Sequence, residues 1–178
     1  MDNQQESSTG LDGRVRWMTG MLEGDGHITI RFNRVGRAAK KAYVLTTVEF
    51  TNTDKAIIEE VVAICKGLGV NMYMKSYKQT PTFARRLTKW VCVTNRMKSA
   101  EPILRAMFPY LIGEKRQRAD YMLKFIESRK RTLEGKHPGW HTKIPYTDEQ
   151  VELVVACKHL VTPWKSPETI RAALLATQ

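Results

Sequence analysis

The residues best suited to chemistry lie in one short stretch, Trp17–Gly26. Gly20 and Gly24 are four apart, so in a helix they share one face, and without side chains there a second helix can approach closely. Asp25 follows directly. Two such helices would bring two of these carboxylates together, which is costly unless cations neutralise them, and oxygen ligands suit magnesium. Gly-Asp-Gly is also a common way to end a helix, and this alternative stays open.

A second group of metal-type residues lies near the C-terminus. His137 and His141 have H-x3-H spacing, and Cys157 and His159 follow. Zinc sites usually contain closer cysteine pairs, and residues 138–140 (Pro-Gly-Trp) are typical of a turn. Structural zinc is therefore the less favoured interpretation, and the sequence leaves the role of this group open.

The charge balance indicates a polyanionic partner. The 178 residues include 29 Lys plus Arg against 18 Asp plus Glu, a net charge of +11 with a pI of about 9.7. A folded basic domain of this kind is typical of nucleic-acid binding. The basic residues concentrate in 31–41, 75–89 and 115–131, without the long amphipathic basic helix that binds a membrane surface. An ordinary solvated basic surface is the alternative.

The remaining composition is that of a globular, intracellular protein. A hydrophobic content of 42% is too high for a disordered chain, and the length suggests one domain. The sequence contains no apolar run long enough to span a membrane, and its first ten residues are polar rather than signal-like. Cys65, Cys92 and Cys157 are odd in number and widely spaced, as expected for reduced thiols. We expect a bacterial cytoplasm or an organelle, not secretion.

Hydrophobic periodicity alternates between helix and strand along the chain. Apolar residues recur at helical spacing from Leu11 to Leu22, whereas strict alternation marks the residues after Gly26. The expected strands are 26–34, 43–50, 70–78 and 86–94, and the expected helices are 11–22, 53–68, 98–108, 114–132, 147–161 and 167–176. We expect a single domain over 1–178, with 1–10 flexible, 137–145 as a linker, and 137–178 as a helical C-terminal extension.

Residues Met18–Gly26 resemble the nine-residue motif that names the LAGLIDADG homing endonucleases. Its matches are Gly20, Asp25 and Gly26, with Met18, Met21, Leu22 and Gly24 as similar replacements. Thr19 and Glu23 depart from the motif, but neither occupies the position of the metal-binding aspartate of the family, which is Asp25 here.

The resemblance extends over about residues 14 to 177. Residues 108–112, 114–119 and 166–172 are similar to later segments of the family, and the helix-hairpin-helix-hairpin order is also the family's. The resemblance implies an α+β fold of α-β-β-α-β-β-α order, with an antiparallel DNA-binding sheet and extra C-terminal helices.

The same resemblance assigns roles to individual residues. Asp25 would bind Mg²⁺ or Mn²⁺, the Gly24 carbonyl would complete that shell, and Gly20 with Gly24 would form the dimer interface. Lys115 would lie near the scissile phosphate, and Asn52 would help to position solvent. A lysine at a helix start is normally a solvated charge, and Asn52 could instead begin a helix cap.

The polar strand faces are the candidate DNA-reading surface. An antiparallel sheet with one polar face fits a major groove, where Arg favours guanine, Asn favours adenine and Glu accepts from cytosine. The candidate strand residues are His27, Thr29, Arg31, Asn33, Tyr43, Thr47 and Glu49. The candidate phosphate contacts of the first connection are Arg34, Arg37, Lys40 and Lys41. The second hairpin adds Tyr73, Lys75, Tyr77, Arg85 and Lys89, and the face of its outer strand stays open.

The sequence thus predicts a site-specific, metal-dependent DNA endonuclease of the intron- or intein-homing type. One motif per chain implies a homodimer on a long, nearly palindromic duplex, cut to give a staggered break. No small-molecule cofactor is expected. An RNA maturase and a catalytically silent DNA-binding regulator on the same fold are the alternatives.

Overall fold

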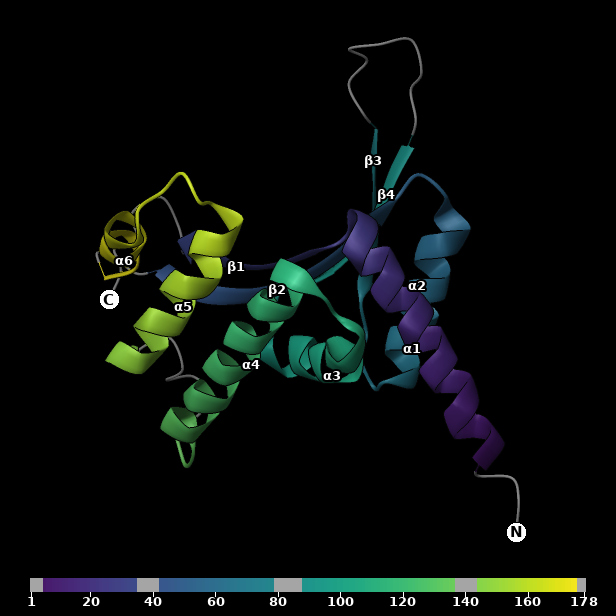
Figure 1. Ribbon diagram of the computed structural model, residues 1–178, viewed down its shortest axis with the longest axis horizontal. Helices are drawn as coiled ribbons and strands as arrows, with labels where there is room; N and C mark the ends of the chain where they lie inside the picture. The colour runs from purple at the N-terminus through teal and green to yellow at the C-terminus, as the bar shows by residue number, and fades with distance from the viewer. Residues whose placement is uncertain (1–4, 35–41, 79–87, 137–143, 176–178) are drawn as a thin grey trace.

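The computed structural model describes residues 5–34, 42–78, 88–136 and 144–175. It is an α+β fold in the expected order (Figure 1). The helices are α1 (Gln5–Asp25), α2 (Lys55–Gly67), α3 (Met97–Met107), the 3-10 turn η1 (Phe108–Tyr110), α4 (Gly113–Leu133), α5 (Asp148–Val161) and α6 (Pro167–Leu175). The strands are β1 (His27–Arg34), β2 (Ala42–Asn52), β3 (Tyr73–Lys78) and β4 (Thr88–Thr94).

The four strands form one antiparallel sheet in the order β1-β2-β4-β3. Its register sets two faces. On β1 and β2, the even-numbered residues such as Ile28, Ile30 and Val48 are fully buried, because they point into the core. The odd-numbered residues point to the opposite face, as the period of two requires.

The helices gather against the even-numbered face of the sheet. In Figure 1, α3, α4 and α5 lie on one side of β1 and β2, and α1 runs beside α2 toward the other end of the molecule. Large side chains from these helices, including Met18, Leu104 and Phe125, join the strand residues in one hydrophobic core. The burial of this one face leaves the polar face for solvent or a partner. Among the described residues, none of the helices is both long and apolar enough to cross a membrane.

The strand prediction for 70–72 is wrong, for a local reason. Val70 and Met72 are buried, as a strand pattern suggests, but β3 begins only at Tyr73, opposite Val93. The Val70 amide donates instead to the Cys65 carbonyl, 2.9 Å away, at the end of α2. The C-terminal turn of a helix thus takes the hydrogen bonds that a strand would need.

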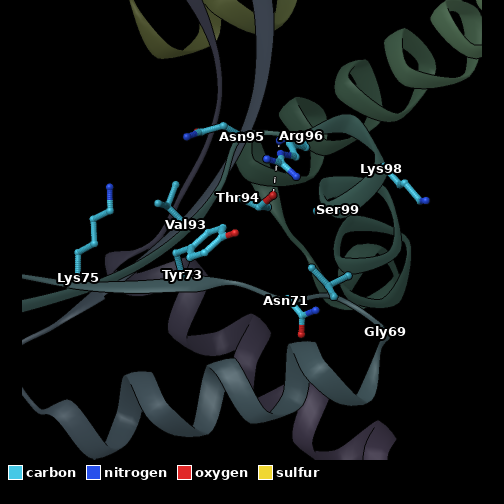
Figure 2. Close-up of a pocket in the computed structure, with 11 residues that line it drawn as sticks. Gly69, Asn71, Tyr73, Lys75, Val93, Thr94, Asn95, Arg96, Lys98 and Ser99 are labelled. Carbon is cyan, nitrogen blue, oxygen red and sulfur yellow. Dashed lines mark hydrogen bonds between the residues drawn. The ribbon is translucent and has the colours of Figure 1, made fainter. Parts of the chain in front are cut away.

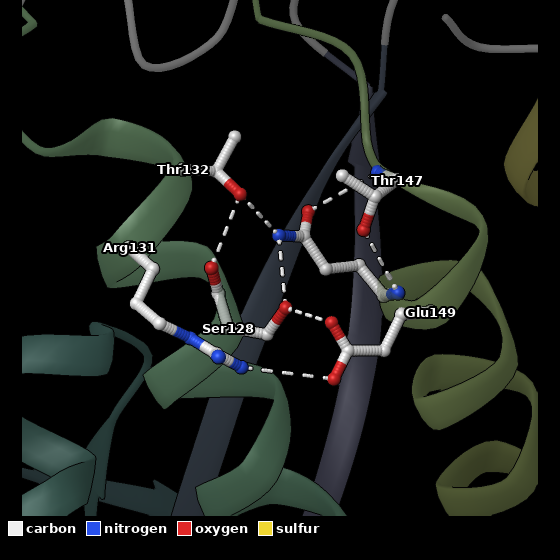
Figure 3. A network of polar contacts seen from close by, with 6 residues as sticks. Ser128, Arg131, Thr132, Thr147 and Glu149 are labelled. Carbon is white, nitrogen blue, oxygen red and sulfur yellow. Dashed lines mark hydrogen bonds and ion pairs between the residues drawn. The ribbon is translucent and has the colours of Figure 1, made fainter.

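Two polar networks attach α5 and the segment before it to α4. A capping box begins α5, with Gln150 N–H donating to Thr147 Oγ1 over 3.3 Å. Ser128 donates to Glu149 over 2.7 Å, and the Gln150 side chain donates to Thr132 over 2.8 Å (Figure 3).

Arg129 fixes the segment that enters α5. It is 3% exposed and donates to the Ile144 and Pro145 carbonyls over 2.7 and 3.0 Å, with its guanidinium 4.4 Å from the centre of the Tyr146 ring. Burial lowers the pKa of Arg129, but its carbonyl partners satisfy its donors. The C-terminal extension is therefore packed on the α/β body rather than appended loosely.

The turn from α1 into β1 requires glycine at position 26. A Cβ there would lie 2.6 Å from Leu22 Cδ1 and 2.7 Å from Leu22 Cα, and backbone cannot move aside cheaply. The Gly26 amide also donates to the Leu22 carbonyl over 3.0 Å. The glycine thus allows the close return of the chain that places the end of α1 beside the sheet.

We expect Gly26→Ala to lower the free energy of unfolding by about 1–3 kcal/mol, because the added methyl overpacks a fixed backbone contact. Urea unfolding followed by circular dichroism measures this. Gly67→Ala is the matched control, because its Cβ would meet only Leu11 Cδ1 at 3.6 Å, an ordinary contact. An equal effect of both substitutions would contradict the steric argument.

Candidate active site and nucleic-acid interface

Asp25 is the last residue of α1 and its side chain is exposed. The Thr51 hydroxyl, near the end of β2, donates to the Asp25 main-chain carbonyl over 3.0 Å. This contact fastens the end of the helix to the edge of the polar sheet face. The Asp25 carboxylate therefore lies where α1 ends and the sheet begins, facing solvent.

Lys115, from the first turn of α4, lies at the same place. Its Nζ donates to the Leu22 carbonyl and, over 2.6 Å, to the Glu23 carbonyl. These are carbonyls of the last turn of α1, where the partial negative charge of a helix end attracts a cation. Burial lowers the pKa of Lys115 and Arg118 adds to the effect, while Glu23 and Asp25 oppose it. The structure thus brings the predicted lysine and carboxylate together.

Glu23 is a site residue that the sequence reasoning did not identify. Its Oε1 accepts the Ile112 amide over 3.0 Å, and Ile112 is the N-cap residue of α4. Glu23 thereby ties the beginning of α4 to the end of α1 and holds Lys115 near Asp25. The sequence carries no signal for this contact, because it depends on how two distant helices meet.

Asn52 is half-buried at the end of β2, next to Thr51. Its Oδ1 accepts the Asp54 amide over 2.8 Å, and Asp54 in turn accepts the Ala56 amide over 2.9 Å as the N-cap of α2. The helix-entry alternative therefore describes the contact that Asn52 makes here, and its role in positioning solvent stays a prediction.

The glycine face of α1 is open. Gly20 and Gly24 are exposed, and a Cβ at either would meet nothing within 4 Å among the described residues. Trp17, on the same face, is 41% exposed, and Ile112 beside the end of α1 is 68% exposed. Two large apolar side chains thus border an unoccupied, flat helix face.

The register of the sheet settles which outer-strand residues share the polar face. His27 pairs with Glu49, Glu49 with Val93, and Val93 with Tyr73. Tyr73, Lys75 and Tyr77 are therefore on the same face as His27 and Glu49, and all three are exposed. Lys89, opposite Tyr77, is half-buried on that face.

An ion pair joins the edge strand β1 to β2 on this face. Arg31 donates to Glu49 over 2.9 Å, across the row in which Thr29 pairs with Thr47. Thr29 and Thr47 are buried beneath it, and Thr47 donates to Asn95 over 2.9 Å. These two threonines are thus less accessible than the alternating pattern predicts, because the longer neighbours pair above them.

Of the other candidate DNA contacts, the structure describes the side chain of Tyr43. Tyr43 is half-buried on β2, opposite Asn33. Asn33 and Arg34 belong to β1, but their side chains lie outside the described part of the chain, as do Arg37, Lys40, Lys41 and Arg85.

Only Cys157 and His159 of the His/Cys group near the C-terminus lie in the described residues. His137 and His141 lie outside them, and no cluster of three or more His, Cys, Asp or Glu able to hold a metal occurs within them. His159 Nδ1 contacts the Lys165 carbonyl at 3.0 Å. Cys65, Cys92 and Cys157 are free and buried, and burial raises the pKa of each thiol to about 12, which makes them unreactive.

Comparison with known proteins finds similarity in structure only. No family model and no curated protein matches the sequence. The homing endonuclease I-CvuI, in complex with its target, matches with a TM-score of 0.63 at 16% identity over 94% of this chain and 96% of that chain. The archaeal intron-encoded homing endonuclease I-Vdi141I, complexed with DNA, gives 0.59 at 11% identity over 92% and 95%.

The LAGLIDADG homing endonuclease I-SmaMI, bound to cleaved DNA, matches with a TM-score of 0.59 at 16% identity over 92% of this chain and 48% of that chain. This chain has the LAGLIDADG homing-endonuclease fold. The expected fold class is therefore confirmed, and so is the resemblance seen in Met18–Gly26 at the level of the fold. In this LAGLIDADG fold, Lys115 contacts the last turn of α1, the helix that ends at Asp25.

We expect Lys115→Met to destabilise the protein by about 1–2 kcal/mol, because the Glu23 carbonyl loses this donor and the Leu22 carbonyl keeps only the Gly26 amide. Equilibrium urea unfolding measures the change. Lys124→Met is the control on the same helix: Lys124 is exposed and bonds only to Asp120 over 2.7 Å, so little change is expected. Equal stability of the Lys115 variant and the wild type would show that the contact is incidental.

Proposed function

We propose that this protein is a divalent-metal-dependent, site-specific double-strand DNA endonuclease of the homing type. The observation that carries the proposal is the position of Asp25. Its exposed carboxylate lies at the end of α1, where Lys115 binds the Glu23 carbonyl and Thr51 of the sheet binds the Asp25 carbonyl. The DNA-bound endonucleases that share the fold support this assignment.

The active unit is a homodimer. One chain offers one Asp25, and cleavage of two strands needs a carboxylate for each. Close crossing of two α1 helices at Gly20 and Gly24 would bring both carboxylates to a two-fold axis, matching a nearly palindromic duplex. The coverage values favour this, since the chain spans 95% of the I-Vdi141I chain but only 48% of the I-SmaMI chain.

The donor chemistry at the end of α1 fits a hard cation. Asp25 supplies a carboxylate and Gly24 a carbonyl oxygen, the ligand types that Mg²⁺ and Mn²⁺ prefer. Asp25 of a second copy, DNA phosphates and water would complete the shell. Bound metal would supply an activated water and charge stabilisation at the scissile phosphate.

Lys115, Asn52 and the polar face of the sheet would hold and orient the DNA. The Lys115 ammonium, fixed on the end of α1, adds positive charge where the phosphodiester becomes more negative during cleavage. Asn52 would help to position solvent beside it. The polar face of the sheet, with His27, Arg31 and Glu49, would enter the major groove and read base edges.

A selection of cleaved sites from a randomised duplex library, with magnesium present, tests the proposal. A recovered consensus site with staggered ends supports a homing-type nuclease. Sequence-specific binding without cleavage would favour the silent regulator instead. Specific binding of structured RNA without either DNA activity would favour the maturase.

We expect Asp25→Asn to lower the cleavage rate on the selected site by about a thousandfold or more, since metal-supplied stabilisation is worth several kcal/mol. DNA binding should persist or tighten, because one carboxylate per subunit no longer repels phosphates. Cleavage kinetics with magnesium and a gel-shift titration measure the two effects.

Asp120→Asn is the matched control, because this carboxylate lies on α4 and, among the described residues, pairs with Lys124 alone. Its cleavage rate should equal that of the wild type. Cleavage by the Asp25 variant at a similar rate would leave Asp25 as no more than a helix stop.

We expect Gly20→Leu to convert a dimer of about 41 kDa, twice the 20.4 kDa chain, into a monomer. The side chain has free space in one chain, so the fold should survive, whereas a wedge at a close crossing costs about 1–3 kcal/mol per subunit. Light scattering measures the mass. Ala63 is exposed on α2, so the control variant Ala63→Leu should stay dimeric. A wild-type protein that is a monomer and still cuts both strands would exclude the dimer.

A further inference from the structure

A polar groove lies at the outer end of the sheet, between the start of β3, the end of β4 and the start of α3. It has a volume of about 710 Å³. Lys75, Arg96 and Lys98 line it, together with Asn71, Tyr73 and Ser99, and none of the described residues that line it is a carboxylate. In Figure 2, Lys75, Tyr73 and Asn95 project to the same side of the sheet, away from α2. The groove therefore opens onto the polar face.

The cations of this groove differ from most others in the described part of the chain. Arg14, Arg16, Arg105 and Lys124 each form an ion pair with a nearby carboxylate. Lys75, Arg96 and Lys98 are exposed, and none of them pairs with a described carboxylate. Three cations that line one groove without an ion-pair partner give it a positive potential, which favours an anionic ligand there.

The start of α3 adds to the positive potential. Arg96 is its N-cap residue, and no side chain accepts a hydrogen bond there. The first-turn amides carry the partial positive charge of the helix, which attracts phosphate groups. Asn71 and Ser99 add neutral hydrogen-bonding groups, which suits a phosphodiester better than an apolar ligand.

The position of the groove matches the width of DNA. Tyr73 of the groove and His27 of β1 lie in one row across four strands, and strands are about 4.8 Å apart, so β3 is about 14 Å from β1. The major groove is about 12 Å wide. If the sheet face lies in that groove, its outer edge reaches the sugar-phosphate wall while the middle faces the bases.

We infer that Arg96 and Lys98, with Lys75, form a binding site for backbone phosphates of the duplex at the outer edge of the reading surface. The site positions the sheet in the major groove and adds affinity that does not depend on base sequence. This inference rests on the proposed binding of duplex DNA, but it requires neither the cognate site nor a metal.

The test measures binding of a fluorescein-labelled duplex of arbitrary sequence over a range of salt concentrations, without magnesium. The double variant Arg96→Gln/Lys98→Gln should show a salt slope smaller by about 0.9 for each lost contact, or about 1.8 per subunit. The matched control, Arg105→Gln/Lys124→Gln, removes the same charge from cations paired with Glu101 and Asp120, and its slope should equal that of the wild type.

The outcomes separate this inference from the function on which it rests. A slope unchanged in the groove variant, or lowered equally in both double variants, overturns the phosphate site. Failure of the wild-type protein to bind any duplex overturns the proposed function and the phosphate site together. Binding of duplex with the expected slopes but no cleavage on any sequence leaves the phosphate site standing and overturns only the nuclease.

Discussion

The contact of Lys115 with the last turn of α1 is the interaction on which the site depends. The last carbonyls of a helix lack some or all of their intrahelical partners. Here a lysine from another helix donates to the Glu23 carbonyl and joins the Gly26 amide at the Leu22 carbonyl. In a second contact between the same helices, the Glu23 carboxylate accepts the Ile112 amide at the start of α4. The two helices thus hold each other by their ends, and a cation and an exposed carboxylate lie together as a result.

This arrangement also explains why Gly26 and Thr51 matter. Gly26 lets the chain turn sharply from α1 into β1. The Thr51 hydroxyl, near the end of β2, holds the Asp25 carbonyl by a hydrogen bond. A hydrolytic site needs groups fixed in position rather than on flexible loops. Here the position of Asp25 is set by a helix end, a strand end and a second helix.

The distribution of charge divides the molecule into two surfaces. On the helices, many exposed cations form ion pairs with carboxylates. Such surface ion pairs contribute little to stability, but they neutralise much of the positive charge there. On the sheet face, Arg31 is held by Glu49, whereas the cations at the outer groove have no such partner. The β1–β2 side of the sheet thus carries paired polar groups, whereas the groove at the β3 side carries cations without a described carboxylate partner.

The sequence by itself determined the order of the elements, the open glycine face of α1 and the polar face of the sheet. These follow from periodicities of 3.6 and two, and from glycine positions, which are local properties of the chain. The motif at Met18–Gly26 pointed correctly to the fold. Tertiary structure alone decided that Lys115 reaches the Glu23 carbonyl at the end of α1, that Arg31 pairs with Glu49 across the Thr29–Thr47 row, and that Lys75 and Arg96 line one groove. Each of these contacts joins separate elements, so the packing of helices and the strand register fix it, and spacing along the chain cannot reveal it.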